Sequence, residues 1–181
     1  MNLKLFEEFK LEDIKNKTVQ TAIEVIKSYG VKVVFKNPDY FAPGSIGTAA
    51  ILSNTIKVST DILKKASVEK IVSLLFHELG HFYCYDTLKY KEYHYGFYKK
   101  NITEKEIKSM VRTALKAELY VENWGKKEMK LYFPNMKYIM GYKRRGYIKR
   151  WIVNYLYDRF DDRIVELEAE KLGKMLDEMG I

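Results

Sequence analysis

The feature that most constrains the fold of this chain is the run His-Glu-Leu-Gly-His, His77 to His81, inside the apolar segment Ile71 to Tyr83. Apolar side chains lie on both sides of this run, so we expect the segment to form a largely buried helix. On a helix, residues four apart share one face and lie about one turn apart. The two imidazoles can therefore bind one Zn²⁺ ion, each at roughly 2.0–2.1 Å.

Glu78 lies between these histidines and points about 100° around the helix from His77. This direction keeps its carboxylate out of the ligand set. It suits a general base for the attacking water in metal-assisted hydrolysis, most often of a peptide bond. The alternative is an ordinary helix with two surface histidines. The apolar flanks disfavour it, because burying polar groups without partners is costly.

A third protein ligand is expected, because catalytic zinc sites usually have three. The longer pattern with a third histidine is excluded, since Cys84 and Thr87 occupy its glycine and histidine positions. Glu118 is the best candidate, because it interrupts the apolar stripe of the next predicted helix. Glu122, one turn later on the same face, is the other. The carboxylate that does not bind the metal could accept the second ring N–H of a ligating histidine.

The stretch Phe76 to His81 resembles the motif helix of the ImmA/IrrE-like zinc metallopeptidases. In that family a later helix supplies a glutamate, an acidic or amide residue at i+4, an aromatic residue at i+6, and then a stretch ending in proline. The matching residues here are Glu118, Glu122, Trp124 and Pro134.

The resemblance covers roughly residues 31–134. It implies a zincin-like fold of the gluzincin kind and Zn²⁺ as the cofactor, held by His77, His81 and Glu118. It also implies Glu78 as the catalytic base. Glu122 would then be the carboxylate that hydrogen-bonds to a ligating histidine without binding the metal. The expected activity is hydrolysis of peptide bonds in a specific regulatory protein, such as a repressor or another transcriptional regulator.

Hydrophobic periodicity and turn residues predict an α+β fold, mostly helical, with a sheet of about three strands beside the motif helix. We expect one domain over residues 1–181, with a catalytic core at about 31–134 and C-terminal helices in 135–181. The expected elements are a helix at Leu11–Tyr29, a strand at Val31–Phe35, a hairpin of Ile46–Leu52 and Thr55–Val58, a motif helix from an N-cap at Ser67 to near Asp86, a helix opened by a capping box at Thr103 and Glu106 and ended by Pro134, and helices near Ile148–Phe160 and Ile164–Met179.

Composition favours a cytoplasmic protein without a membrane segment. No apolar run reaches the roughly 20 residues that span a bilayer, and Glu7 and Glu8 interrupt the region where a signal peptide would be apolar. The single cysteine, Cys84, excludes an intrachain disulfide framework. We expect it to be a small buried side chain rather than an oxidation sensor or a group that crowds the metal.

The net charge of +8 is unevenly distributed, with a basic segment at 126–151 and an acidic one from Asp158 onward. The segment 126–151 is either a solvated face or a surface for nucleic acid or an acidic protein. The alternative function is therefore a non-enzymatic nucleic-acid- or protein-binding module, of a toxin or anti-defence type, with a structural or vestigial metal site. The tyrosine-rich stretch Thr87 to Asn101 is interpreted as either a lid or a surface loop. The sequence leaves the oligomeric state open.

Overall fold

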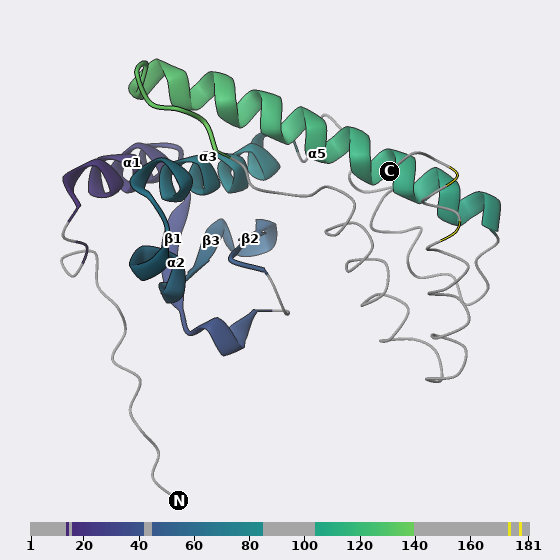
Figure 1. Ribbon diagram of the computed structural model, residues 1–181, viewed down its shortest axis with the longest axis horizontal. Coiled ribbons are helices and arrows are strands. Elements are labelled where there is room, and N and C mark those ends of the chain that lie inside the picture. The colour runs from purple at the N-terminus through teal and green to yellow at the C-terminus, as the bar shows by residue number, and fades with distance from the viewer. Residues whose placement is uncertain are drawn as a thin grey trace, which may run out of the picture. The chain divides into compact units, whose positions relative to one another are not determined.

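The computed structural model describes residues 14, 16–41, 45–84, 104–139, 174 and 178 (Figure 1). Its elements in chain order are α1 (Lys17–Ser28), β1 (Lys32–Lys36), the 3-10 turn η2 (Pro38–Tyr40), β2 (Gly47–Ala50), the 3-10 turn η3 (Ile51–Ser53), β3 (Thr55–Ser59), α2 (Thr60–Lys65), α3 (Val68–Cys84) and α5 (Glu104–Tyr132). Most of these residues are helical and the three strands form one small sheet, which confirms the expected α+β class.

Two compact units make up the chain, one of residues 1–84 and 121–140 and the other of 85–120 and 141–181. The single-domain organisation stays a prediction. The two helices expected near 148–160 and 164–179 lie outside the described residues, apart from Lys174 and Glu178, which are helical. Within the described part of the chain, no helix is both long and apolar enough to cross a bilayer.

Helix α1 begins at Lys17, later than the expected start at Leu11. The reason is Asn16, whose side-chain oxygen accepts hydrogen bonds from the backbone N–H groups of Thr18 at 3.0 Å and Val19 at 3.2 Å. These bonds satisfy N–H groups that have no partner within the helix. Asn16 therefore fixes the first turn, and the expected longer helix is wrong at its start.

The sheet is mixed, with the strand order β1-β3-β2. β1 runs parallel to β3, and β2 runs antiparallel to it, which confirms the expected hairpin. β2 is shorter than the expected strand because Ile51 to Ser53 form the turn η3. Asn54 closes that turn with a φ of 45°, a left-handed conformation that asparagine tolerates better than most residues.

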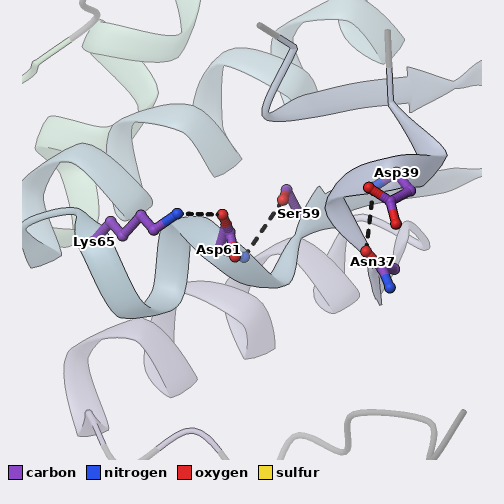
Figure 2. A network of polar contacts seen from close by, with 5 residues as sticks. All are labelled: Asn37, Asp39, Ser59, Asp61 and Lys65. Carbon is purple, nitrogen blue, oxygen red and sulfur yellow. Dashed lines mark hydrogen bonds and ion pairs between the residues drawn. The ribbon is translucent and has the colours of Figure 1, made fainter. Parts of the chain in front are cut away.

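Short polar contacts fix the connections at one end of the sheet (Figure 2). The Asn37 side chain accepts a hydrogen bond from the backbone N–H of Asp39 at 3.2 Å and opens η2. Ser59 accepts one from the N–H of Asp61 at 3.4 Å and caps α2, and Lys65 pairs with Asp61 at 2.5 Å. Hydrophobic periodicity does not predict α2, because its six residues are too few for a clear apolar period.

Helices α1 and α3 cover one face of the sheet (Figure 1). Helix α3 follows Ser67, whose hydroxyl accepts a hydrogen bond from the N–H of Lys70 at 3.3 Å, as expected for its N-cap. The core of the described residues consists of buried aliphatic and aromatic side chains, and the largest fully buried ones include Phe76, Ile23, Ile26, Ile56, Leu74, Leu75 and Leu79. The motif helix is therefore central to the fold, as its apolar flanks predict.

Candidate metal centre

The C-terminal half of α5 packs directly against α3 along a seam of small side chains. A Cβ atom added to Gly80 would lie 3.0 Å from the Val121 carbonyl oxygen, and one added to Gly125 would lie 2.7 Å from the Phe76 carbonyl oxygen. One helical turn further along, the Ser73 hydroxyl lies 3.7 Å from the Met129 sulfur. Since α5 positions rise as α3 positions fall, the two helices run antiparallel at this seam.

Glycine at 80 and 125 lets the two backbones approach more closely than side chains would allow. At Gly80 the neighbouring backbone is that of Val121, and at Gly125 it is that of Phe76. Gly125 was not predicted as a packing residue, although its contact is the tighter one. Tyr83 stacks on Trp124 with ring centroids 4.7 Å apart and closes the side of the seam.

Three side chains able to bind a metal lie together beside this seam: His77 and His81 on α3, and Glu118 on α5. One ligand atom from each, a ring nitrogen or a carboxylate oxygen, lies within 4.8 Å of the other two. Glu118 precedes Val121 by three residues, almost one helical turn. Because Val121 contacts Gly80, which lies beside His81 in the sequence, Glu118 is on the part of α5 near the histidines.

The chemistry and spacing of this donor set fit a zinc ion. A tetrahedral ion with bonds of roughly 2.0–2.1 Å requires ligand atoms about 3.3 Å apart, and the three atoms here lie within 4.8 Å of one another. His77 and His81 are 3% and 8% exposed, and their rings are nearly perpendicular with centroids 4.9 Å apart. Two buried imidazoles with one carboxylate are a ligand combination found in catalytic zinc sites.

Glu78 faces a different neighbour from the two histidines. Its side chain is 4% exposed, and one carboxylate oxygen lies 3.3 Å from the position that a Cβ atom would occupy on Gly47 of β2. The same Cβ atom would meet the Leu74 methyl groups at 3.2 Å. Because Gly47 has no side chain, the Glu78 carboxylate can lie against the backbone of β2.

The sequence motifs do not predict this role of Gly47. The available signal is composition, since β2 reads Gly-Thr-Ala-Ala where β-branched and aromatic residues are usual for a strand. Small residues in a strand often mark a place where another group approaches the backbone.

The remaining predicted site residues fall around this centre. Glu122 is half-buried on α5, one turn after Glu118, and its hydrogen bond to a ligating histidine stays a prediction. Cys84 is fully buried, as expected, and burial raises the pKa of its thiol to about 12. The tyrosine-rich stretch 87–101 lies outside the described residues. The basic segment 126–151 is described up to residue 139, and its lysines there are exposed.

Comparisons of the chain with models of known protein families, with curated proteins and with solved structures find no match. The interpretation of the site therefore depends on its own geometry and on the sequence motif.

Proposed function

We propose that this chain is a zinc-dependent peptidase of the gluzincin kind, with His77, His81 and Glu118 as the ligands and Glu78 as the general base. The observation that carries this proposal is the grouping of two histidines and a glutamate from two packed helices, with a second carboxylate, Glu78, directed at a strand backbone beside them. A purely structural zinc site, by contrast, usually has four protein ligands and no adjacent base.

The chemistry divides between the ion and the chain. A zinc ion, when bound, polarises the scissile carbonyl and makes the attacking water more acidic. Glu78 takes a proton from that water and passes it to the leaving amine. These are the two proton transfers that amide hydrolysis requires. The three ligating side chains hold their positions because both helices are fixed at the seam.

Strand β2 supplies a surface for an extended substrate. It lies at one end of the strand order and, within the described residues, pairs only with β3. Its outward backbone groups can form main-chain hydrogen bonds with a peptide in a β conformation. Gly47 brings Glu78 to this strand, so a peptide paired there passes beside the catalytic base.

The substrate class follows from this geometry and from the resemblance to the ImmA/IrrE-like peptidases. A chain that pairs with β2 must be extended, so the cleaved bond lies in an unfolded or exposed segment of a protein. The resemblance favours a regulatory protein, such as a transcriptional repressor, as the natural substrate.

The test compares wild-type protein with Glu78→Gln. We expect both to bind about one zinc per chain by elemental analysis. Each protein is then added to an extract of the cells that express it, and new N-termini are identified by mass spectrometry. New N-termini should form with the wild type only. Loss of a general base lowers turnover by roughly 10²–10⁴-fold. Full cleavage by the Glu78→Gln variant would contradict the mechanism, and absence of zinc from the wild type would contradict the ligand set.

Glu69→Gln is the matched control. Glu69 is in the first turn of the same helix and is only half-buried. This substitution makes the same chemical change on α3 without touching the site, so zinc content and cleavage should both equal those of the wild type.

A further inference from the structure

The outer face of the sheet, opposite α1 and α3, is strongly basic. Side chains alternate along a strand, and the inward set belongs to the hydrophobic core, with Ile56 and Val58 fully buried. The outward set includes Lys32 and Lys36 on β1 and Lys57 on β3. We refer to the surface around these three lysines as the lysine face.

The strand register places the three lysines close together. Lys57 pairs with Val34, which lies midway between Lys32 and Lys36 on β1. With a strand spacing of about 4.8 Å and a rise of about 3.3 Å per residue, the Cα atom of Lys57 is about 8 Å from those of both other lysines. The three strands contain no acidic residue. This face therefore concentrates positive charge over a small area.

Two acidic residues lie at one end of the sheet, and they do not neutralise the charge of the three lysines. Asp61 pairs with Lys65 of α2. Asp39 lies in η2, and its backbone N–H is held by Asn37. Among the described residues, no ion pair joins either aspartate to a lysine of the lysine face.

An aromatic ring stands beside this charge. Tyr40 of η2 is 52% exposed, and its hydroxyl hydrogen-bonds with the Lys57 ammonium group, which also lies 4.9 Å from the ring centroid. Phe41 supports the ring edge-on, with centroids 5.4 Å apart. Tyr40 is therefore held in place while about half of its surface stays open to a ligand.

We propose that the lysine face, with Tyr40, binds single-stranded nucleic acid. Lysines at this spacing complement a chain of phosphates, and an exposed ring held beside them stacks on an unpaired base. An acidic peptide fits less well, because side chains such as Val34 and Ala50 offer little apolar surface to anchor one. A duplex keeps its bases stacked and leaves Tyr40 without a partner. This binding is separate from the peptidase function and requires no metal.

The experiment measures fluorescence anisotropy of labelled twelve-nucleotide oligo-dT and oligo-U with the full-length protein over a range of salt concentrations. For single-stranded nucleic acid, each neutralised phosphate contributes about −0.7 to the slope of log affinity against log salt concentration. Three lysines that each neutralise one phosphate therefore give a slope of about −2. The triple variant Lys32→Gln, Lys36→Gln, Lys57→Gln should lose most of this slope and bind at least tenfold more weakly. Comparison of the two oligonucleotides shows whether DNA or RNA is preferred.

The matched control removes the same charge elsewhere, by Lys17→Gln, Lys126→Gln and Lys127→Gln. All three lysines are exposed, and the last two belong to the basic segment 126–151. The control should keep the wild-type affinity. Equal loss of affinity in the two triple variants would overturn the proposal, because binding would then follow net charge or the basic segment.

Tyr40 gives an independent readout that does not depend on charge. Tyr40→Ala should weaken single-strand binding at least about fivefold, while Tyr40→Phe, which keeps the ring, should stay within about twofold of the wild type. Equal affinity for duplex DNA or for poly-glutamate would overturn the proposal, as would an unchanged affinity of the Tyr40→Ala variant.

Discussion

Gly125→Ala tests whether the seam between α3 and α5 sets the position of the proposed metal ligands. The new Cβ atom would lie 2.7 Å from the Phe76 carbonyl oxygen and 3.2 Å from the backbone nitrogen of His77. Cβ contacts of less than 3.0 Å are essentially never seen, and 3.0–3.4 Å is still tight. The helices must therefore separate locally by about 0.3–0.7 Å, the difference between 2.7 Å and that range.

Such a separation affects stability and zinc binding to different extents. Overpacking of this kind typically costs about 1–3 kcal/mol in the free energy of unfolding. Glu118 is on the helix that must move, and metal–ligand distances tolerate only about 0.2 Å of change. We therefore expect zinc affinity to fall by about 10–100-fold, as it does when the support of a ligand is disturbed.

The assay is zinc competition against a chromogenic chelator, with urea unfolding of the metal-free protein measured in parallel. Gly30→Ala is the matched control, because Gly30 has a φ of 75° and nothing within 4 Å of an added Cβ atom. Its free energy of unfolding should fall by about 1–2 kcal/mol, because alanine is strained in the left-handed conformation. Its zinc affinity should equal that of the wild type. The reasoning is refuted if Gly125→Ala binds zinc as tightly as Gly30→Ala does.

Four further measurements test the site and the core. Zinc at about a thousand times its dissociation constant should raise the free energy of unfolding by about 4 kcal/mol, measured by calorimetry, and His81→Ala should abolish the gain. Because burial raises the pKa of Cys84 to about 12, its thiol stays protonated at pH 8 and should react with iodoacetamide more than about 100-fold more slowly than in the urea-unfolded chain. The unfolded thiol ionises first, near pH 8.5, so Cys84 should make the native state less stable as pH rises from there toward 12, and Cys84→Ala should remove that part of the pH dependence. Ser73→Ala should lower the free energy of unfolding in urea by about 1–3 kcal/mol, because the Ser73 hydroxyl accepts a 2.8 Å hydrogen bond from the backbone N–H of Ile139.

Local sequence signals predict the motif helix well. Its N-cap at Ser67 and its buried course to Cys84 follow from short-range patterns, namely a capping residue and apolar side chains on all sides. Spacing alone also places His77 and His81 on one face. The proximity of Glu118 follows from a simple energetic argument, since a carboxylate in an apolar stripe requires a cation nearby.

Features that depend on a second segment were harder to predict. Gly47 and Gly125 matter because of the backbones that approach them, and no local pattern identifies those partners. Helix α2 and the early end of β2 depend on single capping and turn residues, which shift element bounds by a few positions. The lysine face forms because β1 and β3 pair in parallel, with Lys57 opposite Val34. Turn residues predict the pairing of strands in a hairpin, but not the register of two parallel strands.

The burial of α3 has a consequence for how the molecule fluctuates. Catalytic side chains commonly come from mobile loops at the protein surface, whereas His77, Glu78 and His81, which we propose as site residues, lie in a helix enclosed by the sheet, α1 and α5. Amide protons along this helix should therefore exchange with deuterium mainly through global unfolding. A mutation that shortens the lifetime of the native state would then expose these three side chains at the moment the helix unfolds, so loss of the proposed activity and loss of folded protein should follow one time course.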